Sequence, residues 1–152
     1  RGFVYLVSIP VNCYKFYRAK DKRPILEELR AFDAERVMLN FETKLDGALS
    51  FHNAEEYQAQ LCYLHEACVF FKKHGFEVGA WFWGLQFDQA FDFITIKTIS
   101  GKQVQNFACP ADERFLAVFQ RCLRDVAKTG VDMILLNDDL RFGAWNGVGF
   151  CV

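Results

Sequence analysis

Residues 53–83, NAEEYQAQLCYLHEACVFFKKHGFEVGAWFW, contain the signals that decide the fold class. Asn53 and Glu56 have the spacing of a helix N-cap and capping box. Behind them, apolar residues recur at helical spacing at Tyr57, Leu61, Leu64, Cys68 and Phe71. Gly75 ends this pattern, and the apolar run 78–83 is typical of a buried strand. The stretch therefore predicts an amphipathic helix followed at once by a buried strand.

The same alternation extends in both directions along the chain. Buried strands are predicted at 3–8, 36–41, 78–83 and 132–137, and the other helices begin near Pro24 and Pro110. A predicted β-hairpin over 93–107, turning at Ser100-Gly101, interrupts the alternation before the last helix. Apolar strands that alternate with helices form parallel sheets through right-handed crossovers. We therefore expect an α/β fold.

Two α/β architectures compete at this point. A doubly wound sheet usually has a glycine-rich phosphate loop after its first strand, but Ser8–Asn12 contains no such motif. A (β/α)8 TIM-type barrel places its chemistry on loops at the carboxyl ends of its strands, where this sequence is rich in polar and aromatic residues. We favour the barrel. The 152 residues hold about four βα units, whereas eight would need roughly 300 residues. Residues 1–152 are thus expected to be the amino-terminal half of a single barrel domain, truncated at both ends.

Composition and charge exclude several other classes. A chain that is 52% hydrophobic, with 17 Phe, 5 Tyr and 3 Trp, is too apolar to be intrinsically disordered. A formal net charge of -1 lacks the basic excess of a nucleic-acid-binding protein. The apolar run near Cys68–Phe71 is interrupted by Lys72 and Lys73, so we expect no membrane span. No signal peptide is recognised, and we expect a cytoplasmic protein, although a segment upstream of Arg1 would be able to carry a signal.

The six cysteines are spread along the chain and do not predict a disulfide scaffold. Cys62, Cys68, Cys109 and Cys122 lie in or beside helical patterns, where reduced cysteines act as small buried apolar residues. Cys62, His65 and Cys68 rotate around their helix in steps of three and lack a fourth ligand. We therefore expect neither a metal site nor another cofactor.

The segment Gly130–Arg141, GVDMILLNDDLR, is the strongest candidate for chemistry. Its apolar strand runs directly into Asp138, Asp139 and Arg141, which places two carboxylates and a guanidinium at the barrel mouth. A carboxylate that a neighbouring Arg keeps ionised suits an acid, a base or a nucleophile. The alternative is structural: Asp138 and Asp139 cap the loop and pair with Arg141.

This segment, together with Asn106–Pro110 (NFACP) and the helix between them, resembles the third-helix to fourth-strand region of TIM-barrel glycoside hydrolases and their uncharacterised relatives. His74–Trp81 resembles their third strand more weakly, and Gly147–Cys151 keeps part of their G-C-F-C segment. The order of elements is similar over most of the chain, whereas the motifs are short.

The resemblance implies a catalytic carboxylate at the end of the fourth strand. In the α-galactosidase-like clan the nucleophilic aspartate directly follows the apolar run, where this sequence has Asn137. Asp138 or Asp139 is therefore the expected catalytic residue. Asn137 and Arg141 are expected to contact the substrate.

Aromatic and polar residues near the other strand ends are candidates for sugar contacts. Trp81 and Trp83 share a strand face, from which an indole can stack on a sugar, or they fill the core. Trp145 lies in a glycine-flanked loop and is a second stacking candidate. Glu42 is either a second carboxylate, a hydrogen-bond acceptor or a solvated loop residue. Residues that follow the first three strands complete the set: Asn12, Tyr14, Asn40 and Gln86.

We therefore expect a glycoside hydrolase-like barrel that acts on a carbohydrate, with no nucleic-acid or membrane partner. Glycosidic hydrolysis requires two carboxyl groups, and only one cluster is evident here. The second carboxyl group would lie in the remaining half of the barrel in the same full-length chain, so residues 1–152 alone are expected to be inactive. The alternatives are a non-catalytic carbohydrate-binding barrel and a metabolic barrel enzyme that acts on a phosphorylated substrate.

Overall fold

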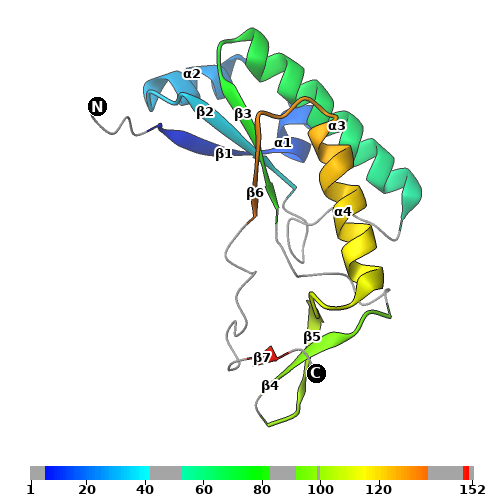
Figure 1. Cartoon of the computed structure of the whole chain (residues 1–152). Helices are drawn as coiled ribbons and strands as arrows, with labels where there is room; N and C mark the ends of the chain where they lie inside the picture. Colours follow the sequence, from blue (N-terminus) through cyan, green and yellow to red (C-terminus); the bar gives the residue numbers. More distant parts are fainter. Residues whose placement is uncertain (1–5, 42–52, 83–91, 99, 137–148, 151–152) are drawn as a thin grey trace.

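Strands and helices alternate along the chain in the computed structural model, which describes residues 6–41, 53–82, 92–98, 100–136 and 149–150 (Figure 1). In order, the elements are β1 (Ser8–Asn12), α1 (Cys13–Arg18), α2 (Arg23–Ala31), β2 (Arg36–Asn40), α3 (Ala54–Lys73), β3 (Glu77–Phe82), β4 (Thr95–Thr98), β5 (Gln103–Ala108), α4 (Glu113–Ala127), β6 (Met133–Leu136) and β7 (Gly149–Phe150). The predicted α/β class is confirmed. No helix among the described residues is both long and apolar enough to span a bilayer.

The main sheet has four strands in the order β1-β2-β3-β6, and every neighbouring pair is parallel. Strands β4 and β5 belong to a separate small sheet. Within the main sheet, each strand therefore lies beside the strand that follows it in the sequence. A doubly wound sheet reverses its strand order at a switch point. The sequential order observed here contains no such reversal.

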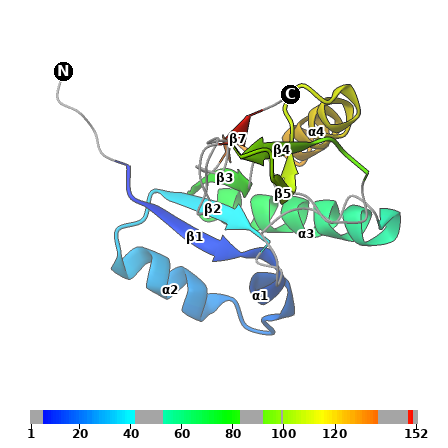
Figure 2. The ribbon, with the colours of Figure 1, turned by 90° about the horizontal axis from the view of Figure 1, so that it is seen from below.

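The four helices of the described residues pack against one face of this sheet. The sheet contributes alternate residues to the shared core, among them Val37, Leu39, Val78 and Ala80. The helices contribute Cys13 and Phe16 from α1, Leu26 and Leu29 from α2, Leu64, Cys68 and Phe71 from α3, and Cys122 and Val126 from α4. Figure 2 shows α1 and α2 together on one side of β1 and β2. The helices thus form a single layer, as the apolar stripes of the sequence require.

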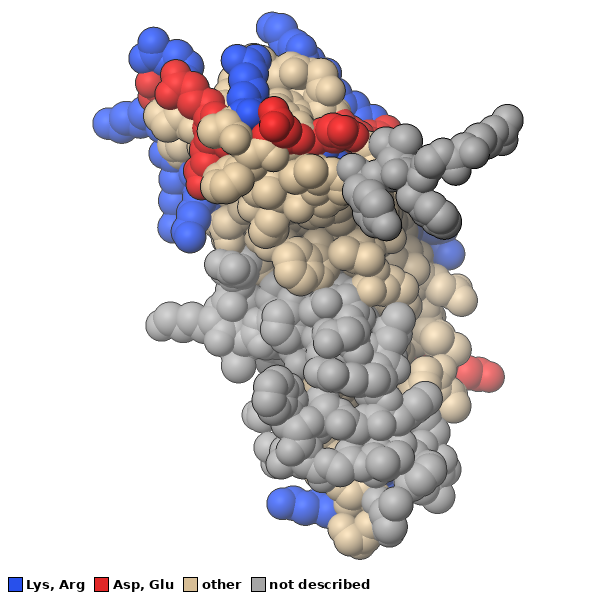
Figure 3. All heavy atoms as spheres, turned by 90° about the vertical axis from the view of Figure 1, so that its left-hand side faces the viewer, with Lys and Arg blue, Asp and Glu red and all other residues tan. Residues whose placement is uncertain are grey.

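No described helix covers the opposite face, which carries the other alternate residues of each strand. The side chains of Met38 and Met133 pack directly against Gly79. A Cβ added at Gly79 would lie 2.5 Å from Met38 Sδ and 2.9 Å from Met133 Cγ, so the glycine is needed for this close packing. Leu135 is 42% exposed. Seen from the left of Figure 1, most of the visible Lys, Arg, Asp and Glu side chains gather at the upper end, and other residue types predominate in the described surface just below them (Figure 3). The face that no described helix covers, named the uncovered face from here on, is therefore apolar around Met38, Gly79 and Leu135.

The predicted hairpin over 93–107 is confirmed as β4 and β5, and β7 pairs with the other side of β4. Phe93 packs edge-on against Phe115 of α4, and Phe115 stacks on Phe119, each pair at 5.6 Å between ring centroids. This small sheet lies beyond the carboxyl ends of β3 and β6 (Figure 1). It is thus anchored to α4 through aromatic contacts.

The first described strand, β1, lies further along the chain than the predicted 3–8, of which 3–5 lie outside the described residues. Pro10, interpreted as the end of a strand, lies inside β1. Val7 O accepts hydrogen bonds from Glu35 and Arg36, so the alternating backbone directs Pro10 away from β2. Proline is tolerated there because β1 has no neighbour on that side among the described strands.

Asp112 joins the small sheet to α4. Its side chain is 3% exposed and accepts hydrogen bonds from the backbone N–H groups of Ile94, at 2.7 Å, and Arg114, at 3.0 Å. Its Oδ2 also lies 3.0 Å from the Arg114 guanidinium. These hydrogen bonds, chiefly the one from the Arg114 side chain and then that from Ile94, lower the pKa of Asp112 to about 2. The ionised carboxylate is therefore the form that the fold stabilises.

Replacing Asp112 by asparagine is expected to reduce the acid sensitivity of the fold. The folded pKa lies below the unfolded value of 3.8, so the carboxylate stabilises the fold above about pH 4, and this contribution is lost as the pH falls towards 2. Asp112→Asn should therefore cost about 1 kcal/mol at pH 7 and less near pH 2, measured by urea unfolding. Asp21→Asn, at an exposed ion pair, is the control. A wild-type pH dependence in Asp112→Asn would contradict this account.

Candidate functional site

The carboxyl ends of β1, β2, β3 and β6 lie along one edge of the main sheet because these strands are parallel. In sequence, the segments 42–52, 83–91 and 137–148 follow β2, β3 and β6, and all three lie outside the described residues. Most of the predicted site residues fall in them: Glu42, Trp83, Gln86, Asn137, Asp138, Asp139, Arg141 and Trp145. Their predicted roles stay predictions.

Asn12, Asn40 and Trp81 occupy one row across this carboxyl edge. Asn12 is in register with Asn40, and Trp81 is in register with Leu135. Leu39 pairs with Ala80, so the next residue of each strand, Asn40 and Trp81, lies beside the other. Leu39 and Ala80 point into the core beneath the helices, and the side chains of Asn40 and Trp81 therefore point to the uncovered face.

Two polar atoms in this row are buried without a hydrogen-bond partner among the described residues. They are Asn40 Oδ1, an acceptor, and Trp81 Nε1, a donor. Asn12 differs, because its Oδ1 caps α1 by accepting from Lys15 N at 2.9 Å. An unsatisfied buried polar group costs about 1–3 kcal/mol, and native proteins seldom retain one without a reason. The carboxyl edge thus has an unsatisfied hydrogen-bond acceptor, Asn40 Oδ1, on the strand next to that of an unsatisfied donor, Trp81 Nε1.

Tyr14, which the sequence places near the same mouth, has a structural role. Its ring lies 5.3 Å from that of Phe41 and 6.1 Å from that of Tyr63, in edge-on packing. Its hydroxyl accepts a hydrogen bond from Gln60 and donates one to Glu56, both on α3. Burial is the main cause of the raised pKa of Tyr14. The side chain of Tyr14 therefore packs towards α3, and its predicted place at the mouth stays a prediction.

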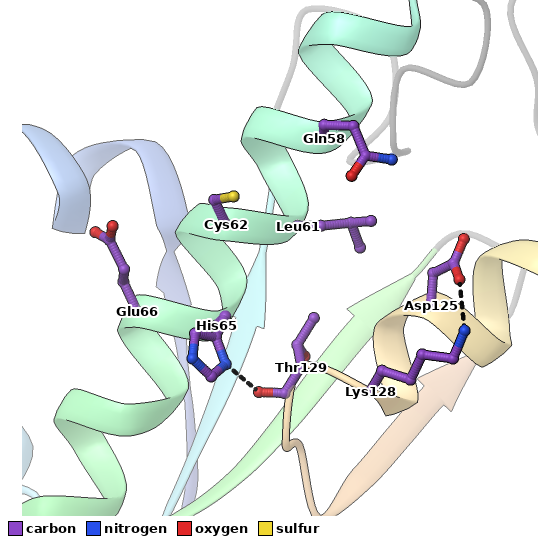
Figure 4. Close-up of a pocket in the computed structure, with 8 residues that line it drawn as sticks. All are labelled: Gln58, Leu61, Cys62, His65, Glu66, Asp125, Lys128 and Thr129. Atoms are coloured by element: carbon purple, nitrogen blue, oxygen red, sulfur yellow. Dashed lines mark hydrogen bonds and ion pairs between the residues drawn. The ribbon is translucent and has the colours of Figure 1, made fainter.

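A concave region away from this edge lies between α3 and the end of α4 and has a volume of about 510 Å³ (Figure 4). It is lined by Gln58, Leu61, Cys62, His65, Glu66, Asp125, Lys128 and Thr129. His65 Nδ1 lies 3.0 Å from the Thr129 carbonyl oxygen, which only accepts, so this nitrogen is the donor. Lys128 Nζ pairs with Asp125 Oδ1 at 3.4 Å. His65 therefore links α3 to the turn that follows α4.

The cysteines agree only in part with their predicted role as buried thiols. Cys68 and Cys122 are free and buried, as predicted. Cys62 is free but exposed on the helix surface, so its predicted burial was wrong. Cys109 is buried as predicted but is disulfide-bonded, so its predicted reduced state was wrong. No group of three or more metal-ligating side chains is found in the described part of the chain.

Comparisons with known proteins do not add a family to this geometry. No protein-family model, curated protein or solved structure matches the chain. The functional interpretation therefore depends on the sequence motifs and on the residues at the carboxyl edge.

Proposed function

We propose that this chain forms the first half of a TIM-barrel glycoside hydrolase-like protein that acts on a carbohydrate. The sequential parallel order β1-β2-β3-β6 supports this proposal. So does the single helix layer, because consecutive βα units of a barrel keep all their helices outside and one sheet face inside. A doubly wound sheet carries helices on both faces.

Four strands are half of the eight that such a barrel requires. The proposal therefore assigns four further strand–helix units to the same full-length chain. They would pair with the free edges of β1 and β6 and cover the apolar face around Met38, Gly79 and Leu135. This arrangement would place the exposed side chain of Leu135, beside the buried Met38, in a core.

The row formed by Asn12, Asn40 and Trp81 at the carboxyl edge is the observation that carries the proposed function. Barrel enzymes bind their substrates at this edge. Amide groups hydrogen-bond hydroxyls, and an indole combines an apolar ring with one N–H donor, so the row suits a sugar. Asp138 and Asp139 follow β6 in sequence and would supply one of the two carboxyl groups that hydrolysis requires.

Turnover of aryl glycosides by the full-length protein tests this function. The panel comprises the 4-nitrophenyl α- and β-glucosides, galactosides and mannosides, with released nitrophenol as the readout. We expect the full-length protein to hydrolyse at least one of them and residues 1–152 alone to hydrolyse none. Binding of a sugar without turnover would favour a non-catalytic barrel instead, and turnover by residues 1–152 would contradict the half-barrel.

A further inference from the structure

Asn40 and Trp81 offer complementary chemistry that the chain itself leaves unused. Asn40 Oδ1 needs a donor and Trp81 Nε1 needs an acceptor, yet the two atoms do not bond to each other. Their strands are neighbours, and the register places the two residues side by side. One small group between them would satisfy both atoms if it both donated and accepted a hydrogen bond.

We propose that Asn40 and Trp81 form a subsite for a single substrate hydroxyl, which donates to Asn40 Oδ1 and accepts from Trp81 Nε1. This inference rests on the proposed function and deepens it, because it assigns a specificity determinant to the carboxyl edge. Both atoms are buried in the free chain. The side chains that cover them must therefore move when the hydroxyl enters.

The pair selects for a neutral hydroxyl among the polar groups that a substrate can carry. A carboxylate or phosphate oxygen only accepts and would face the amide oxygen of Asn40 without a proton between them. An ammonium group only donates and would leave the Trp81 N–H unmet. A methyl ether accepts but cannot donate. Substrates that lack the hydroxyl leave both buried groups unpaired, which is the strongest form of discrimination by hydrogen bonding.

Monodeoxy analogues of the hexoside that the full-length wild type hydrolyses fastest test the subsite. We expect kcat/KM to fall about 100-fold for one analogue only, the one that lacks the bound hydroxyl. Asn40→Leu, which removes the acceptor, and Trp81→Phe, which removes the N–H but keeps an aromatic ring, should each lower kcat/KM about 10- to 100-fold on the parent hexoside. On the sensitive analogue, neither substitution should cause a further loss.

Gln58→Leu is the matched control, because this amide is exposed in the α3–α4 groove and away from the edge. It should leave the analogue profile unchanged. Equal losses on all analogues, or a fall in thermal stability without a change in selectivity, would overturn the subsite and indicate that a bound water satisfies the pair. The proposed function would survive that result. It fails separately if the wild type hydrolyses no hexoside.

Discussion

The double substitution Asp138→Asn plus Asp139→Asn is expected to lower the kcat of the full-length protein by about 10²- to 10⁴-fold. Both carboxylates follow β6 in the sequence, and one of them is proposed to act as acid, base or nucleophile. Asparagine keeps the shape of each side chain and removes its charge and its proton-transfer ability. Initial rates on the hexoside that the wild type hydrolyses fastest give the measurement, and the two single variants identify which carboxylate is responsible.

Asp33→Asn provides the control for this charge removal. Asp33 is exposed and has φ 49°, a left-handed conformation that asparagine also tolerates. Its substitution should leave kcat unchanged. Wild-type turnover in the Asp138/Asp139 double variant would refute a catalytic role and leave these residues as loop caps that pair with Arg141.

Truncating Phe71 to alanine is expected to lower the free energy of unfolding by about 3–5 kcal/mol. Phe71 is fully buried, and its ring lies 5.0 Å from that of Phe16 and 5.3 Å from that of Phe70. The change leaves a cavity where α1, α3 and the sheet meet. Since domains are typically stable by only about 5–15 kcal/mol, this single change removes a large part of the total.

Urea unfolding followed by circular dichroism measures this loss. Phe32→Ala is the matched control, because Phe32 is 60% exposed and its truncation should cost less than about 0.5 kcal/mol. Similar midpoints for the two variants would show that α3 does not pack against the sheet as described.

Local signals were sufficient to predict α3. Asn53 Oδ1 accepts from the N–H groups of Glu55 and Glu56, both at 3.1 Å, as an N-cap should, and Gly75 follows the helix with φ 89°. The first strand was misplaced because proline was interpreted as a strand end, whereas its effect depends on which side of the strand has a neighbour. Helix α1 was not predicted because its six residues show no clear apolar period.

The candidate site could be predicted only as a set of strand ends. Asn40 and Trp81 were each identified from their position after or near a buried run, but their adjacency depends on strand register. Parallel register is determined by packing between strands that are distant in sequence, so no local pattern reveals it. The unmet hydrogen bonds of Asn40 and Trp81 were hidden for the same reason.

A sheet face that no described helix covers, and two sheet edges without a described neighbour, should make the proposed half-barrel associate. The outer edge of β1 carries Pro10, which has no N–H to donate, so β6 with its exposed Leu135 is the expected contact. Leu135→Lys should therefore weaken self-association. Val69→Lys, at a 53% exposed position on the helix layer, should leave it unchanged.

The solution mass of residues 1–152, measured by light scattering over a range of concentrations, tests the half-barrel most directly. We predict a mass that rises above the 17.6 kDa of a single chain as the concentration increases, and that falls back towards 17.6 kDa in Leu135→Lys. A monodisperse 17.6 kDa monomer at all concentrations would contradict the half-barrel and show that the four-stranded sheet is complete as it stands.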